Sequence, residues 1–360
     1  SREPLAFVSA PGRTEVIGNH TDHNLGRVLA AAVDLDTVAA VAPSDNSVVT
    51  LWSDGYDKSF IVDLNDLSVH EEEKETTYAL IRGVAARLKA LGYKTGGFDA
   101  CVTSTVFKGS GLSSSAAFEV MLVAVFDALF NGWVIDAKLR AQISQYAENV
   151  YFGKPSGLMD QMASSVGGLV TIDFLPEQPD VRAIQYDFHK KGYAVCVVTV
   201  GGDHGDLTAE YAGITTEMRQ VSQALGVRAL AETDGEKLTE ALPSLKNRVP
   251  DRAILRAFHF VDETARVGEA VAALERDDVD AFLNALVASG ESSWKLLQNL
   301  YVPGSDNQEM PLALEMSRRM LAGHGAWRIH GGGFAGTILA FVPLDLLDTY
   351  RARMDAVFGA

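Results

Sequence analysis

The first half of the chain alternates short apolar runs with polar or glycine-containing breaks, a pattern typical of β-strands. The expected strands cover residues 5–9, 27–33, 37–43, 47–53, 58–64 and 98–106. Two longer segments carry apolar residues at three- and four-residue spacing, which predicts amphipathic helices over 78–92 and 138–153. A continuous apolar run at 121–130 predicts a buried helix. We therefore expect a mixed sheet with helices in this half.

The pattern changes after about residue 175, where LPEQPD forms a polar break with two prolines. The segments that follow are a strand at 193–200, helices at 207–226, 251–275, 277–289 and 311–322, then a strand at 336–342 and a helix at 344–354. We place a domain boundary near residue 178, which gives an N-terminal domain of residues 1–178 and a C-terminal domain of residues 179–360.

Composition agrees with two globular domains. A chain of 360 residues exceeds what one compact core usually holds, and 47% apolar with 22% charged residues is ordinary for a folded protein. The formal charge of −16 disfavours nucleic acid and acidic membrane surfaces as partners. Cys101 and Cys196 lie in strand-like segments, which suits reduced thiols, and we find no apolar run of roughly 18 residues. We expect a cytoplasmic monomer.

Small and hydroxyl residues precede the buried helix in KGSGLSSSAAFEV, residues 108–120. Glycines bring backbone close to a ligand, and a helix start offers unpaired N–H groups and a positive dipole end, which together bind anions such as nucleotide phosphates. The candidate loop residues are Lys108, Gly109, Ser110, Gly111, Leu112, Ser113, Ser114, Ser115 and Ala116. A serine-capped helix after a glycine turn is the common alternative. The stretch lacks the GKS or GKT of a Walker motif and the GxSxG of a serine hydrolase.

Two further glycine-containing segments accompany this loop: APGRTEVIGNHTDHNLG at 10–26 and RIHGGGFAGTILAFV at 328–342. Their order resembles the three signature motifs of the galactokinase, homoserine kinase, mevalonate kinase and phosphomevalonate kinase superfamily. Within it, GRTEVIGNHTDHN is similar to the galactokinase pattern GRVNLIGEHTDYN, and KPSGLMDQMASSVGGLVTIDF at 154–174 is similar to the stretch around GIMDQF. The resemblance covers nearly the whole chain.

The resemblance implies a two-domain α+β fold. The N-terminal domain would be like ribosomal protein S5 domain 2 and the C-terminal domain ferredoxin-like, with the active site in the cleft between them. It implies a kinase that transfers the γ-phosphoryl group of ATP to the C1 hydroxyl of α-D-galactose, giving galactose 1-phosphate and ADP.

The resemblance also implies roles for individual residues. By motif position, Asp160 is the base beside the C1 hydroxyl, and Arg13 orients it and steadies the transferred group. Ser115 and Glu148 are the expected Mg²⁺ ligands, which fits the preference of this ion for oxygen. Burial among apolar neighbours would raise the pKa of Asp160, and Arg13 would lower it. The sequence leaves the balance open.

The expected sugar contacts are Asn19, His20 and Asp22 of the first motif, joined by Tyr211. Each of these residues would on its own be read as an ordinary polar or surface side chain, so the assignment depends on the family motif. The glycines at 331–333 would bring backbone close to the site from the other side, although GGG alone is only a flexible turn.

Several positions depart from the galactokinase pattern. Asn19 stands where galactokinases have a glutamate that reaches the C6 end of the sugar, and Glu15 stands where they have asparagine. Loss of the anion removes repulsion toward a C6 carboxylate, so a galacturonate kinase is the second hypothesis. Alternatively, the two residues have exchanged places and still serve galactose. Thr77 and Leu80 replace an aromatic pair associated with the adenine pocket, with Tyr78 nearby.

Two hypotheses come from other functional classes. His20, Asp22 and His23 have a spacing that can bind zinc, as in a metal-dependent hydrolase, although such a site needs further ligands. A catalytically silent sugar sensor would also bind ATP and sugar. We favour an active kinase, because Arg13, Asp160, Glu148 and the serine-rich loop are all present.

Overall fold

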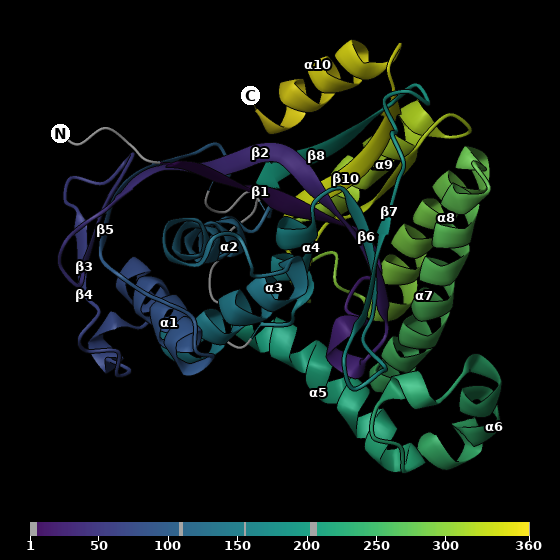
Figure 1. The fold of residues 1–360 in the computed structure, drawn as a ribbon. Coiled ribbons are helices and arrows are strands. Elements are labelled where there is room, and N and C mark those ends of the chain that lie inside the picture. Colours follow the sequence, from purple (N-terminus) through teal and green to yellow (C-terminus); the bar gives the residue numbers. More distant parts are fainter. Residues whose placement is uncertain (1–5, 108–110, 155, 202–206, 360) are drawn as a thin grey trace. The chain divides into compact units, whose positions relative to one another are not determined.

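The computed structural model describes residues 6–107, 111–154, 156–201 and 207–359 (Figure 1). Its internal contacts divide the chain into two compact units. The first unit contains the described residues up to Thr14 together with Ala31–Gly168, and the second contains Glu15–Ala30 and the described residues from Leu169 onward. The expected boundary near residue 178 therefore differs from the observed division. The reason is that the long strands β1 (Ala6–Ile17) and β2 (Arg27–Pro43) run through both units.

The first unit is a mixed sheet with helices. Its strands follow the order β4-β3-β5-β2, with β1 paired to β2. β5 runs antiparallel to β2 and parallel to β3, and β3 and β4 are antiparallel. The further elements are β3 (Val48–Ser53), β4 (Phe60–Asp63), η2 (Glu71–Glu73), α1 (Thr77–Ala90), β5 (Phe98–Ser104), α2 (Ser114–Phe126), η3 (Asp127–Asn131), α3 (Ala137–Tyr146), η4 (Ala147–Phe152) and α4 (Met159–Val166). The mixed sheet with helices predicted from sequence is confirmed.

Side-chain alternation explains how this sheet is covered. Leu51 and Phe98 point inward and are fully buried. Trp52, the residue after Leu51, points to the other face, and so does its neighbour in register on β5, Cys101; both are exposed. Helices α1 and α2 pack on the inner face, where their apolar side chains join those of the strands in one core. The first-unit residues of the candidate site lie in β1, at the start of α2, in η4 and in α4.

Helix α2 is apolar on all sides because it is the central helix of this core. Together with η3 it forms an 18-residue run, Ser114–Asn131, that is long and apolar enough to cross a membrane. The expectation that no such run exists is therefore wrong. Within the structure, 61% of that run is buried, as in the core helix of a globular domain.

The second unit contains a three-stranded antiparallel sheet of order β8-β10-β9, and the hairpin-like pair β6 and β7. Helices α7 and α8 lie side by side (Figure 1). The elements are η1 (Asp22–Asn24), β6 (Leu169–Asp173), β7 (Asp180–Ile184), β8 (Tyr193–Gly201), α5 (Thr208–Leu225), η5 (Leu230–Glu232), α6 (Gly235–Leu245), α7 (Asp251–Glu275), α8 (Val279–Ser292), η6 (Ser293–Leu297), α9 (Glu309–Leu321), β9 (Ala326–Ile329), β10 (Gly336–Pro343) and α10 (Leu347–Phe358).

The long helices and β8 and β10 were predicted, and several short elements were not. Strands β6, β7 and β9 have only four or five residues, so their sequence patterns are weak. Helix α6 contains Pro243, a residue that usually ends a helix. β2 is one strand of 17 residues rather than two. The polar stretch 34–36 stays extended, and the carbonyl of Asp36 accepts from the N–H of Thr105, directly after β5, at 3.0 Å.

Candidate active site

The loop before α2 is held against the first motif within the first unit. Residues 108–110 of the predicted phosphate loop lie outside the described residues. After them, Ser113 adopts a left-handed conformation with φ of 57°, which turns the chain sharply into α2 at Ser114. The backbone N–H of Arg13 donates to the carbonyl of Leu112 at 3.0 Å. The first motif and the start of α2, with its unpaired N–H groups, are thus placed together.

Arg13 and Asp160 form the central pair of this region. Nε and Nη2 of Arg13 donate to Oδ1 and Oδ2 of Asp160, both at 2.6 Å, in a two-point contact. Ser113 Oγ donates to Oδ2 at 2.7 Å, and Arg13 Nη1 donates to the carbonyl of Gly111 at 2.6 Å. The first motif, the loop and α4 therefore meet at one carboxylate, as the sequence predicted for Arg13 and Asp160.

The charge state of Asp160 follows from two opposing effects. Burial on its own would raise the pKa of this carboxyl, but the charge and hydrogen bonds of Arg13, aided by Ser113, lower it overall. Asp160 is therefore ionised at neutral pH, with a cation bound across both oxygens. This answers the question that the sequence left open.

Ser115 and Glu148, the predicted Mg²⁺ ligands, also lie together. Ser115 Oγ donates to Glu148 Oε1 at 3.2 Å. Glu148 lies in η4, a π-helical turn that continues α3, and it is almost fully buried. Lys154 Nζ contacts the same oxygen at 3.0 Å, and Ser156 Oγ donates to Oε2 at 2.5 Å. The carboxylate is thus neutralised by a lysine from the loop that leads to α4.

A hydroxyl and a carboxylate are the hard oxygen ligands that Mg²⁺ takes, and this ion usually completes its shell with phosphate and water. Ser115 and Glu148 fit that requirement. The described residues contain no group of three or more His, Cys, Asp or Glu side chains that could hold a metal ion by themselves. A zinc site of His20, Asp22 and His23 therefore receives no support from the described part of the chain.

A cavity of about 600 Å³ opens beside the start of α2 in the first unit. Ser114 and Ser115 line one side, and Phe107 lies at the end of the preceding strand region. The first turn of α1 provides Thr77 and Tyr78, two of the positions that the sequence singled out for a base pocket. The cavity is large enough for a nucleotide base, and its wall includes predicted phosphate-loop residues.

The first-motif turn lies in the second unit and presents His20. This residue has a left-handed φ of 57° and is buried. Its Nε2 lies 2.9 Å from the carbonyl of Gly332, so Nε2 carries the proton. Burial lowers its pKa to about 3, which makes the ring neutral. Nδ1 is then an acceptor, and it has no hydrogen-bond partner among the described residues.

Asn19 is enclosed by hydrogen bonds within the second unit. Its Nδ2 donates to Glu15 Oε1 at 3.2 Å and to the carbonyl of Gly331 at 2.7 Å. Its Oδ1 accepts from Asn299 Nδ2 at 2.9 Å and from Ser293 Oγ at 3.5 Å. Both donors and both acceptor positions are occupied, and the side chain is fully buried. With these contacts Asn19 supports the turn, and its side chain has no polar atom left to bind a sugar.

Helix α7 holds the backbone of the same turn. Glu263, fully buried, accepts from the N–H groups of Gly18 at 3.1 Å and Asn19 at 3.4 Å. His259 Nε2 lies 2.9 Å from the carbonyl of Asn19 and, since a carbonyl only accepts, donates to it. Ser289 and Arg266 also donate to Glu263. The conformation that exposes His20 is thus set by a buried polar network.

Asp22 and Tyr211 complete the predicted sugar residues. Asp22 is half-buried, and its Oδ1 accepts from the backbone N–H of His23 at 2.9 Å. Tyr211 from α5 donates through its hydroxyl to the carbonyl of Gly333 at 3.1 Å. A Cβ on Gly332 would come within 2.5 Å of the Tyr211 ring, so glycine is required for this packing. Asp22 and Tyr211 thus belong to the same unit as His20.

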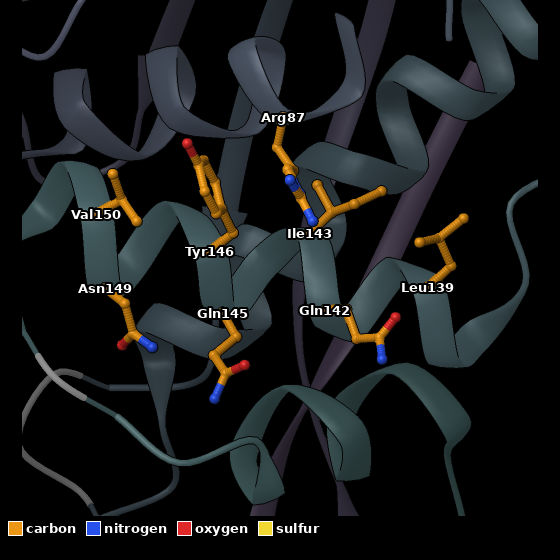
Figure 2. Close-up of a pocket in the computed structure, with 8 residues that line it drawn as sticks. All are labelled: Arg87, Leu139, Gln142, Ile143, Gln145, Tyr146, Asn149 and Val150. Atoms are coloured by element: carbon orange, nitrogen blue, oxygen red, sulfur yellow. The ribbon is translucent and has the colours of Figure 1, made fainter. Parts of the chain in front are cut away.

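The first unit contains another pocket. It measures about 370 Å³ and lies between α1 and the helix formed by α3 and η4 (Figure 2). Arg87 covers the ring of Tyr146 with its guanidinium carbon 4.7 Å from the ring centre. None of the predicted site residues lines this pocket. It does not enter the candidate site.

The residues that support the candidate site residues in each unit were not predicted from the sequence. His259 and Glu263 were not among the site residues predicted from sequence, and Gln161 entered the sequence analysis only within the segment 154–174. A charged or histidine side chain at an apolar helix position was the available signal, since such residues are rarely buried without a partner. It could not have indicated which partner.

The chain is similar to known galactokinases over most of its length. Residues 1–43 match the family signature described as the galactokinase galactose-binding signature, and residues 79–168 match the N-terminal domain of GHMP kinases. Galactokinase of Streptomyces coelicolor is 32% identical over 364 residues, which cover 99% of this chain and 90% of that protein. Galactokinase of Glaesserella parasuis is 30% identical, covering 96% and 87%.

Solved structures of this superfamily have the same fold. Lactococcus lactis galactokinase, determined as a complex with galactose, superimposes with a TM-score of 0.85 at 24% identity, covering 98% of this chain and 89% of that one. Methanococcus jannaschii mevalonate kinase gives a TM-score of 0.70 at 15% identity, covering 99% and 96%. The near-complete coverage by curated relatives, the matched signatures and the shared fold show that the chain belongs to the galactokinase family of the GHMP kinase superfamily.

Proposed function

We propose that this protein transfers the γ-phosphoryl group of ATP to the C1 hydroxyl of α-D-galactose, producing galactose 1-phosphate and ADP. The observation that carries the proposal is the two-point contact of Arg13 with Asp160, together with the hydrogen bond that Ser113 of the predicted phosphate loop donates to the same carboxylate. An ionised carboxylate fixed beside the nucleotide site can accept the proton of an attacking hydroxyl. Arg13 supplies the positive charge that phosphoryl transfer requires.

The nucleotide and metal sites are proposed within the first unit. The cavity lined by Thr77, Tyr78 and Ser114 would take the base, and the N–H groups at the start of α2 would bind phosphate oxygens. Ser115 and Glu148 would hold Mg²⁺, which neutralises phosphate charge and orients the transferred group when it is bound. Lys154 would remain as a further cation at the edge of this site.

Replacing Tyr78 by alanine (Tyr78→Ala) is expected to raise the KM for ATP about five- to tenfold, because the cavity loses an aromatic wall that packs edge-on against Phe60. The KM for galactose should change less than twofold. Steady-state kinetics with each substrate varied in turn measure this. Trp52→Ala is the matched control, since Trp52 lies exposed on the other face of the sheet. An unchanged KM for ATP in Tyr78→Ala would contradict the base assignment.

The sugar site is proposed within the second unit. His20 Nδ1 is a buried acceptor without a described partner, so it can accept from a sugar hydroxyl. Asp22 would accept from neighbouring hydroxyls, and Tyr211 would pack beside the glycines at 331–333. An acceptor left unpaired in a buried site is costly, which gives such contacts discrimination between sugars.

Glu263→Gln is expected to raise the KM for galactose about tenfold. The glutamine amide would place an N–H donor opposite the backbone N–H of Gly18 or the guanidinium of Arg266, which are donors themselves. The turn carrying His20 would loosen, while kcat and the KM for ATP should stay within about threefold of the original values. Kinetics with galactose varied at saturating ATP test this. Glu275→Gln on the same helix, an exposed residue, is the control. Equal KM values in the two variants would contradict the role of Glu263.

A coupled assay for ADP formation with galactose, galacturonate, N-acetylgalactosamine and arabinose tests the proposed function. We expect the highest kcat/KM with galactose. A kcat/KM for galacturonate more than ten times that for galactose would identify galacturonate as the substrate. Binding of ATP and sugar without ADP formation from any of them would identify a sensor instead of a kinase.

Galacturonate is retained as the second candidate because of the charges in the sugar unit. Asn19 carries no charge, and the carboxylate of Glu15 pairs with Arg328 Nη2 at 2.9 Å. Glu15 is therefore bound inside the protein, so the idea that Glu15 and Asn19 have exchanged sugar-binding roles receives no support from this geometry. A C6 carboxylate would meet less negative charge here than in the galactokinase pattern.

Other expectations remain predictions. These are the S5-like and ferredoxin-like domain assignments, a cleft between the domains in which the two substrates meet, the monomeric state and the cytoplasmic location. We propose them together with the reaction.

A further inference from the structure

Helix α2 carries a glutamate at its apolar centre. Glu119 has no exposed surface, and the residues that follow it along the helix, 120–126, are buried apolar side chains. A carboxyl group in such surroundings is costly unless it is hydrogen-bonded. A hydrophobic side chain would pack this position at lower cost, so the glutamate calls for an explanation beyond core packing.

The contacts of Glu119 lead to the proposed metal site. Gln161 Nε2 donates to Glu119 Oε2 at 3.1 Å and to Glu148 Oε2 at 2.7 Å. An amide nitrogen has two hydrogens, so one goes to each carboxyl group and none remains. Gln161 follows Asp160 in sequence and is itself fully buried. The only described partner of Glu119 is therefore the side chain that also binds Glu148.

The orientation of the Gln161 amide depends on this arrangement. Its Oε1 and Glu119 Oε1 have no hydrogen-bond partner among the described residues. If the amide were reversed, its oxygen would face Glu148 Oε2, which would lose its 2.7 Å donor. Burial, followed by the charge of Glu148, raises the pKa of Glu119 well above its ordinary value, which favours the neutral form of its carboxyl group.

We propose that Glu119 and Gln161 are positioning residues that hold Glu148 in the orientation in which its other oxygen faces Ser115. This inference rests on the proposed function, in which Ser115 and Glu148 bind the metal of the metal–nucleotide complex. Glu119 fixes the amide of Gln161, and the amide fixes Glu148 Oε2. Glu148 Oε1 then faces Ser115 Oγ, which donates to it at 3.2 Å.

The experiment measures metal binding without turnover. Mn²⁺ is titrated into protein with a non-hydrolysable ATP analogue and followed by electron paramagnetic resonance. Glu119→Leu and Gln161→Leu are each expected to weaken Mn²⁺ binding about three- to tenfold, which corresponds to the loss of one hydrogen bond. Glu119→Gln keeps a neutral hydrogen-bonding group of the same shape and should stay within about threefold. Kinetics should show a higher Mg²⁺ requirement with the KM for galactose unchanged.

Asp127→Asn is the matched control. Asp127 is also a fully buried acid, it lies on the continuation of α2 in η3, and it accepts from the N–H groups of Val134 and Ile135 at 3.0 Å each. Asp127→Asn should lower stability without changing Mn²⁺ affinity. If loss of a buried acid weakened Mn²⁺ binding only by disturbing core packing, this variant would weaken it too. Circular dichroism verifies folding of each variant, and Gln161→Leu tests the inference if Glu119→Leu does not fold.

The outcomes separate the inference from the proposed function. Mn²⁺ binding by Glu119→Leu and Gln161→Leu that equals the unmodified protein would overturn the positioning role alone. A loss in Glu119→Gln as large as in Glu119→Leu would overturn it as well, because Glu119 would then act through its charge. Absence of nucleotide-dependent Mn²⁺ binding by the unmodified protein would overturn the proposed metal site and this inference together.

Discussion

Asp160→Asn is expected to lower kcat about 10³-fold, because the amide cannot accept the proton of the attacking hydroxyl. The effect should be mainly on kcat, since the side chain keeps its size and its contact with Ser113 can persist. The amide also turns a donor toward the guanidinium of Arg13, which disturbs the contact now made at 2.6 Å to both oxygens. ADP formation at saturating ATP and galactose measures the change.

Binding and control measurements make this prediction specific. Calorimetric titration of galactose and of an ATP analogue into Asp160→Asn should still give binding, with affinities within about tenfold of the original. Asp36→Asn is the control, because Asp36 also accepts a hydrogen bond in the first unit, from Ser9 Oγ at 2.6 Å, away from the site. Its kcat should change less than about twofold. More than one tenth of the original kcat in Asp160→Asn would refute the role as base.

The sequence predicted the contacts within the proposed reacting centre better than the contacts that surround it. Arg13 and Asp160 are 147 positions apart, and Ser115 and Glu148 are 33 apart, yet each pair was predicted from motif resemblance and each is in contact. The motifs work because glycines allow positive φ values and close backbone approaches that other residues cannot adopt, as at Gly111, Gly331 and Gly333. Helical and strand periodicity likewise predicted the long elements, since burial of one face repeats along the chain.

Long-range hydrogen bonds explain what the sequence could not supply. Asn19 was predicted to contact the sugar, but its bonds to Asn299 and Gly331, about 280 and 312 residues away, occupy its polar atoms. The partners of Glu263 lie 244 or more residues before it at the first-motif turn. No local pattern records such pairing, because it depends on how distant segments pack. The same applies to the amide of Gln161 between two glutamates.

Arg328→Met is expected to destabilise the folded protein by about 3–5 kcal/mol, because it leaves the buried carboxylate of Glu15 without its cation. Arg328 is 1% exposed, and Nη1 also donates to the carbonyl of Val16 at 2.8 Å. Urea denaturation followed by tryptophan fluorescence gives the free energy of unfolding. Arg318→Met, which removes an exposed arginine paired with Glu315 on α9, should cost less than about 1 kcal/mol.

The pH dependence and a second substitution show whether charge is the cause. Burial raises the pKa of Glu15, and Arg328 opposes that rise, so removing the arginine raises the pKa further. When the pKa of a carboxyl group is higher in the folded than in the unfolded protein, the free energy of unfolding falls as pH rises between the two pKa values. The cost of Arg328→Met should therefore be larger at about pH 8 than at about pH 5. Adding Glu15→Gln removes the unpaired charge and should recover part of the loss at the higher pH. If the double variant is no more stable than Arg328→Met at either pH, the loss comes from packing around Val16, and the ion pair is not what stabilises the first-motif strand.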